Sequence, residues 1–217
     1  MTVIQKRFTP PSVNAAEILR YAGMPQCTAD IAEILPALID EAQAHIDMRV
    51  CYAVLPVTVT LTGVAVGAMH LPSKDVATLL ANRKNAVVFA ATLGVDFDRL
   101  LAKYSVTSLT RAALLQAIGA ERVEALCDVF CGELQQTYGG VTPRFSAGYG
   151  DLPLECQRDF VQCLDTPRHI GVSLSESMLL TPAKSVTAVV GITDTPCAHK
   201  NTCATCQKTD CSMRRNP

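Results

Sequence analysis

The sequence predicts an α+β fold followed by a short cysteine-rich tail. Val57, Val59 and Leu61 alternate with threonines, which is the period of a strand with one buried face. From 109 to 136, apolar residues recur at the 3.6-residue spacing of a long helix. Because the predicted helices and strands do not alternate strictly, an α+β fold is favoured over a doubly wound parallel sheet.

The other elements follow from local signals. The first helix ends near Gly23, and Gly139 ends the long helix. Gly119 interrupts that helix and indicates close packing. Asp151 is a residue type that caps the start of a helix. In chain order we expect helices over 14–21, 29–46, 96–104, 109–136 and 151–164, and strands over 57–61, 85–91 and 185–192.

Composition excludes several classes of protein. Hydrophobic residues make up 49% of the 217 residues and charged residues 18%, which predicts a folded core. A net charge of −1 gives no basic surplus for nucleic acid. We find no signal peptide and no apolar run of membrane-spanning length, so a cytoplasmic protein without nucleic-acid or membrane partners is expected. Composition changes near Asp194, so we expect a body over 1–193 and a tail over 194–217.

The connection over 142–155 has the residue types of a small-molecule site. Gly148 and Gly150 flank Tyr149 and allow backbone amides to approach a ligand closely. Arg144 supplies a fork of donors that suits a carboxylate, and Tyr149 offers a ring and a hydroxyl. An amino acid attached to a nucleoside would use all three features. On spacing alone, a glycine-rich loop whose arginine pairs with a surface acid remains open.

Two motifs in this region resemble a known family. Arg144-Phe-Ser-Ala-Gly-Tyr149 resembles the Arg-x-x-x-Gly-Tyr signature of the activation domain of cobalamin-dependent methionine synthase. The stretch over 170–186 resembles that family's Ile-Gly-x-x-Leu-Thr-Glu-Ser and Pro-x-x-Ser-Val motifs, and 120–125 resembles a segment before the signature. The matching positions of the second stretch are Ile170, Gly171, Leu174, Glu176, Ser177, Pro182, Ser185 and Val186.

The resemblance implies a twisted antiparallel sheet with flanking helices and a shallow groove for S-adenosylmethionine. It also implies a methyltransferase component of methionine biosynthesis, which returns an inactivated corrinoid to its methylated state. The corrinoid does the difficult chemistry, and the protein orients the sulfonium methyl group. No catalytic acid or base is expected.

The resemblance also carries roles for single residues. Arg144 would hold the methionine carboxylate. The backbone of Ser146, Ala147 and Gly148 would contact the adenosine or the amino acid, and Tyr149 would line the same groove.

Two further positions are less settled by the motif. Glu176 matches a family acid, and a structural role at a strand edge is an equal alternative. Val190 stands where the family motif has a tyrosine, which removes one ligand contact.

The corrinoid is expected on a partner. The sequence has no Asp-x-His-x-x-Gly corrinoid-binding motif, so we expect a separate activation subunit that acts on a methionine synthase core or another corrinoid methyltransferase. A reductase or flavodoxin-like donor would supply electrons. The alternatives are a non-catalytic binding module and an iron–sulfur electron-transfer protein acting on a corrinoid protein.

The tail offers four thiolates within 15 residues, at Cys197, Cys203, Cys206 and Cys211. Four soft ligands suit tetrahedral zinc or an iron–sulfur cluster, and a reduced tail without metal is the alternative. The body cysteines Cys127, Cys131 and Cys163 are expected to pack as small apolar residues.

Overall fold

The computed structural model describes residues 1–24 and 27–194. Its strands are β1 (Ile4–Phe8), β2 (Met48–Thr60), β3 (Gly63–Val66), β4 (Met69–Leu71), β5 (Asn85–Thr92), β6 (Ser173–Leu174), β7 (Leu180–Thr181) and β8 (Ser185–Gly191). The main sheet has the order β4-β3-β2-β5-β8, with β1 also paired to β2, and β6 and β7 form a separate pair. Neighbouring strands are antiparallel throughout the main sheet.

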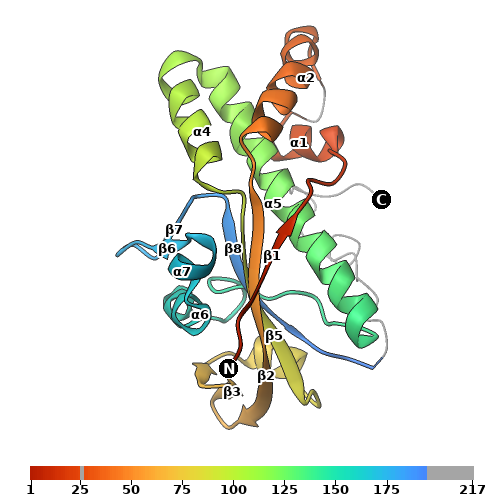
Figure 1. Cartoon of the computed structure of the whole chain (residues 1–217), viewed down its shortest axis with the longest axis vertical. Helices are drawn as coiled ribbons and strands as arrows, with labels where there is room; N and C mark the ends of the chain where they lie inside the picture. Colours follow the sequence, from red (N-terminus) through yellow and green to blue (C-terminus); the bar gives the residue numbers. More distant parts are fainter. Residues whose placement is uncertain (25–26, 195–217) are drawn as a thin grey trace.

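Helices cover both faces of this sheet (Figure 1). They are α1 (Ala15–Tyr21), α2 (Ala29–Ala44), α3 (Lys74–Leu79), α4 (Val95–Thr107), α5 (Leu109–Tyr138), α6 (Gln157–Leu164) and α7 (Thr166–Ile170), with a 3-10 turn at Leu154–Cys156. The predicted α+β fold, an antiparallel sheet with flanking helices, is therefore confirmed. Within the described part of the chain, no helix combines the length and apolar character needed to cross a membrane.

Strand periodicity divides the core into two layers. On β2, Val50 and Tyr52 face α1, α2, α4 and α5, whereas Cys51 and Ala53 face α6 and α7. Successive side chains of a strand point to opposite faces, so one strand contributes to both layers. The sheet is thus buried on both sides, which explains why β5 reads as a continuous apolar run rather than an alternating one.

The first layer is centred on Phe130 of α5. Its ring lies 5.0 Å from that of Phe89 and 5.1 Å from that of Tyr52, between ring centroids. Gly119 does not break α5. A Cβ atom there would lie 2.6 Å from the Phe97 ring, so this glycine allows α4 and α5 to pack closely, as its position predicted.

The helix predicted from Asp151 begins later, at Gln157. Pro153 and the 3-10 turn intervene, and Asp151 instead caps α3. Its carboxylate accepts hydrogen bonds from the Ser73 hydroxyl and from the Lys74 amide at 2.8 Å. These bonds lower the pKa of Asp151, with the Ser73 bond as the main cause. Asp151 does cap a helix, as predicted, but that helix is α3 and not the helix that follows Asp151 in sequence.

Candidate functional site

The segment that contains Arg144 lies along the edge of β8. Val141 pairs with Ile192, and Phe145 pairs with Val189, with a 3.0 Å bond from the Phe145 amide to the Val189 carbonyl. Because consecutive residues of an extended segment face opposite ways, Arg144 and Phe145 point to different sides of the sheet. Arg144 points toward α5, and Phe145 packs against the layer under α6 and α7.

The Arg144 guanidinium is held by two carboxylates one turn apart on α5. It donates to Asp128 at 2.6 Å and also to Glu124. Burial lowers the pKa of Arg144, but the carboxylates of Glu124 and Asp128 raise it by more, so the pKa lies above its ordinary value. The arginine is therefore a fixed cation with its stem buried and 21% of its side chain exposed.

Cys127 and Cys131 are neighbours of Arg144 on the buried side of α5. Both are buried free thiols, and burial is the main cause that raises the pKa of each. Thiols with raised pKa values stay protonated and weakly nucleophilic at neutral pH. The expectation that they pack as small apolar residues agrees with this burial.

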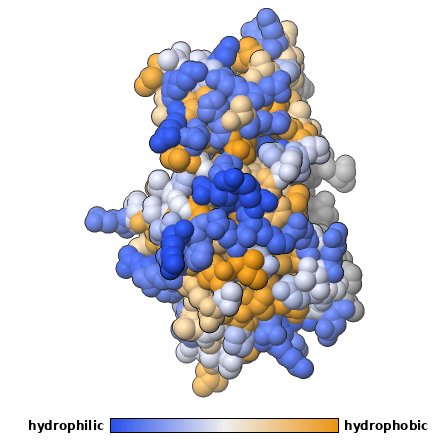
Figure 2. All heavy atoms as spheres, viewed as in Figure 1, coloured by the Kyte–Doolittle hydropathy of each residue, from blue (hydrophilic) through white to orange (hydrophobic). Residues whose placement is uncertain are grey.

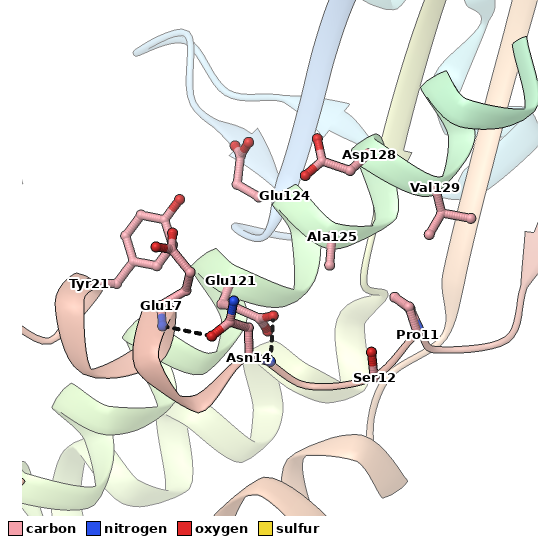
Figure 3. A pocket seen from close by; sticks show the side chains of 10 residues that line it. All are labelled: Pro11, Ser12, Asn14, Glu17, Tyr21, Glu121, Glu124, Ala125, Asp128 and Val129. Carbon is pink, nitrogen blue, oxygen red and sulfur yellow. Dashed lines mark hydrogen bonds between the residues drawn. The ribbon is translucent and has the colours of Figure 1, made fainter. Parts of the chain in front are cut away.

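A groove opens beside Glu124 and Asp128, between α5 and the N-terminal segment (Figure 3). Its volume of about 450 Å³ falls within the range of roughly 300–1,000 Å³ that is common for small-molecule sites. The lining residues are Pro11, Ser12, Asn14, Glu17, Tyr21, Glu121, Glu124, Ala125, Asp128 and Val129.

Carboxylates dominate the polar lining of this groove. Glu17, Glu121, Glu124 and Asp128 pair with Arg20, Arg122 and Arg144. Four carboxylates against three guanidiniums leave one net negative charge in this set of described residues. The groove therefore favours a ligand that carries positive charge.

One aromatic residue completes the α1 side of the groove. Tyr21 presents its ring there, and the Arg20 guanidinium lies 4.3 Å from the ring centroid. A ring beside acids suits a ligand with a flat base and a cationic centre.

The rest of the signature loop turns away from α5. The Gly148 amide donates to the Leu152 carbonyl at 2.9 Å, and the Tyr149 amide donates to the Ser146 carbonyl at 3.2 Å. The Tyr149 ring meets Phe145 edge-on with 6.0 Å between centroids, and 72% of the residue is exposed. Arg144 and Tyr149 thus contact different elements. The Gly148 and Tyr149 amides take part in hydrogen bonds within the loop, and the expected contacts of Ser146, Ala147 and Gly148 with a ligand stay a prediction.

Glu176 lies in the turn between β6 and β7, on the α6 side of the sheet. It lines a groove with Arg158 and Val161 of α6, apart from the carboxylates of α5. Val190 is fully buried and pairs with Val87 in the sheet, within the first core layer. The structure thus brings neither residue to the α5 groove.

The predicted tail ligands Cys197, Cys203, Cys206 and Cys211 lie outside the described residues. Among the residues that are described, no three histidine, cysteine or acidic side chains are grouped as metal ligands would be.

The N-terminal wall of the groove was missed by the sequence predictions, as were the acids of α5. A signal for the acids was present, because Glu121, Glu124 and Asp128 follow a spacing of three and four residues on a mostly apolar helix. Such an acidic stripe places three carboxylates on one helix face.

Neither a known family model nor a curated protein matches this sequence. A solved structure does match, described as the MetH reactivation domain bound to AdoHcy. Its TM-score is 0.63 with 14% sequence identity, and the match covers 88% of this chain and 78% of that chain. The fold is that of the MetH reactivation domain. The resemblance predicted from the two motifs therefore extends over most of the chain, at the level of the fold.

Proposed function

We propose that this protein binds S-adenosylmethionine in the groove between α1 and α5, and presents its methyl group to a corrinoid carried by another domain or protein. The central observation is the arrangement of Arg144, Glu124 and Asp128, a fixed cation between acids at the edge of a ligand-sized groove. The MetH reactivation domain, which has a similar fold, was solved with AdoHcy.

The charges of the ligand match those of the groove. S-adenosylmethionine carries a sulfonium, an ammonium and a carboxylate. The two cationic groups suit the side chains of Glu17, Glu124 and Asp128, which line the groove. The ligand carboxylate suits the Arg144 guanidinium, which pairs with Glu124 and Asp128 beside the groove. Tyr21 offers a ring for the adenine.

The chemical role follows from the ligand. A reduced corrinoid on a partner would supply the electron pair for the methyl group, and AdoHcy would be left once the sulfur–methyl bond had broken. This chain needs no acid or base for that transfer. Its residues hold the nucleoside and direct the methyl group outward from an open groove. An external reductase or flavodoxin-like protein would keep the corrinoid reduced.

Calorimetric titration with S-adenosylmethionine and with AdoHcy tests the binding step. We expect saturable heat with both, and competition between them. If neither ligand gives heat or protection against thermal unfolding at millimolar concentration, the proposal is wrong.

Transfer is tested separately with hydroxocobalamin reduced by titanium(III) citrate. We expect faster formation of methylcobalamin from S-adenosylmethionine when the protein is present. If the protein binds S-adenosylmethionine but does not accelerate methylation of free or protein-bound corrinoid, it is a binding module and not a methyl-transfer component.

A metal in the tail remains a separate proposal that rests on the cysteine spacing alone. Metal analysis and visible absorbance of protein purified without oxygen distinguish an iron–sulfur cluster from zinc. A colourless, metal-free protein would remove both.

A further inference from the structure

The wall of the groove opposite α5 depends on an unusual pair of charges. Glu121 and Arg122 are neighbours on α5, and both are buried, with Arg122 fully inaccessible to solvent. A buried guanidinium is costly unless its N–H groups are satisfied. The Arg122 partners therefore show what this arginine organises.

Arg122 binds the chain just after β1. Its Nη1 donates to the Pro11 carbonyl at 2.7 Å, and its Nη2 donates to the Ser12 carbonyl at 2.9 Å. The same Nη2 donates to Glu121 at 2.6 Å, and Nε donates to the other oxygen of that carboxylate. One side chain thus connects two backbone carbonyls that lie about 110 residues away in sequence.

Glu121 makes the third connection to the same segment. Its Oε1 accepts a hydrogen bond from the Asn14 amide at 3.1 Å (Figure 3). The Asn14 side chain in turn caps α1 by accepting a bond from the Glu17 amide at 3.2 Å. The buried pair therefore fixes both the segment over 11–14 and the start of α1.

The local sequence explains why this segment needs outside partners. Pro10 and Pro11 follow β1 after a single residue, Thr9, and proline has no amide hydrogen for a continued strand. The carbonyls of Pro11 and Ser12 would otherwise be partly buried without donors. Arg122 supplies these donors in place of a neighbouring strand.

The segment over 11–21 supplies half of the residues that line the groove: Pro11, Ser12, Asn14, Glu17 and Tyr21. We propose that Glu121 and Arg122 are positioning residues, which hold this wall at the separation from α5 that a nucleoside ligand requires. This inference takes the identity of the ligand from the proposed function. The attachment of the wall by Arg122 and Glu121 does not depend on that identity.

The test compares Arg122→Met and Glu121→Gln with the parent protein. Arg122→Met keeps the length of the side chain but removes every donor. We expect amide hydrogen exchange over 9–22 to become at least about tenfold faster, while exchange in β5 changes little. AdoHcy affinity should fall at least about tenfold. Glu121→Gln keeps an acceptor for Asn14, so we expect a smaller change in the same direction.

A matched control separates positioning from general destabilisation. Phe160→Leu removes volume from the other core layer, under α6, far from the groove in the packing of the sheet. When Phe160→Leu and Arg122→Met lose the same thermal stability, Phe160→Leu should still bind AdoHcy with the affinity of the parent and show the parent's hydrogen exchange over 9–22. The positioning role would be overturned if both variants lost the same affinity for AdoHcy. It would also be overturned if hydrogen exchange over 9–22 in Arg122→Met were the same as in the parent.

The two proposals can fail independently. A parent protein that binds no nucleoside removes the proposed function, and the exchange data still decide whether Arg122 holds the wall. If Arg122→Met does not fold, Glu121→Gln decides by the same two measurements.

Discussion

The groove beside α5 and the groove beside the β6–β7 hairpin differ in how their walls are made. The first is lined by four carboxylates, and its walls are tied together by buried charges. The second, about 560 Å³, is lined by uncharged residues, half of them apolar and half of them serine, threonine or glutamine, and Leu179 at its rim is 65% exposed. The comparison teaches that the two grooves are similar in volume and differ in fixed charge, which is why the proposed function places the ligand in the charged one.

The surface is also uneven in polarity. On the face drawn in Figure 2, hydrophilic residues gather across the middle of the molecule, and a patch of apolar residues lies below them, toward the end where β2 and β3 lie. The following changes test whether the two grooves differ in function as they differ in chemistry.

Arg144→Ala should have the largest effect on nucleoside binding. It removes the cation that pairs with Glu124 and Asp128 and that, in the proposed function, would hold the ligand carboxylate. We expect AdoHcy affinity to fall about 10- to 100-fold, the usual loss for one or two hydrogen bonds to a charged group. Titration calorimetry measures it.

Arg99→Ala is the control, because it breaks an exposed pair with Asp96 on α4. It should leave affinity unchanged. Parental affinity in Arg144→Ala as well would remove the α5 groove as the binding site.

Asp128→Asn should change selectivity more than affinity. It keeps the shape of the groove but removes its net negative charge. The sulfonium of S-adenosylmethionine then loses its electrostatic attraction to the groove, whereas AdoHcy loses no such attraction because its thioether is uncharged. We expect the preference for S-adenosylmethionine over AdoHcy to fall about two- to fivefold, because Asp128 is 65% exposed.

High salt should reduce the same preference in the parent protein. Asp96→Asn serves as a charge-matched control away from the groove. A preference that responds to neither Asp128→Asn nor salt would mean that charge does not select the ligand.

Tyr149→Ala should have a smaller effect than the motif resemblance implies. The ring contacts Phe145 and is mostly exposed, on the other side of the segment from Arg144. We expect AdoHcy affinity to change by less than about threefold, since only an edge-on ring contact is lost. A loss as large as that of Arg144→Ala would show that the loop closes over the ligand on binding.

Leu179→Ser should have the smallest effect. The side chain is exposed at the hairpin rim, so stability should stay within about 0.5 kcal/mol of the parent. Thermal unfolding and AdoHcy titration should both match the parent. Weaker nucleoside binding would instead assign the ligand to the hairpin groove.

Elements with a long, regular pattern could be predicted from the sequence. The helix expected over 109–136 is α5, Leu109–Tyr138, because the apolar face of this thirty-residue helix outweighs its two interior glycines, Gly119 and Gly132. The short strands β6 and β7, with two residues each, were not predicted, because they exist only through their pairing with each other. Asp151 was assigned to the wrong helix because its partners on α3 are more than 70 residues away.

The candidate site was predictable only in part. Arg144 was singled out from its motif, and the alternative that it pairs with a surface acid matches its contacts with Glu124 and Asp128. The N-terminal wall was not predictable. It depends on hydrogen bonds from Arg122 to the carbonyls of Pro11 and Ser12, which lie about 110 residues away and share no local sequence pattern with it. A motif predicts roles for the residues of one loop, whereas the groove is lined by two segments, 11–21 and 121–129, that are distant in sequence.

The segment that aims Arg144 at α5 has a second effect, on self-association. By pairing at Val141 and Phe145, it occupies part of the free hydrogen-bonding edge of β8. Exposed strand edges recruit strands from other molecules and lead to aggregation. Substitutions that loosen this segment would therefore lower solubility and also move Arg144 away from its partners on α5.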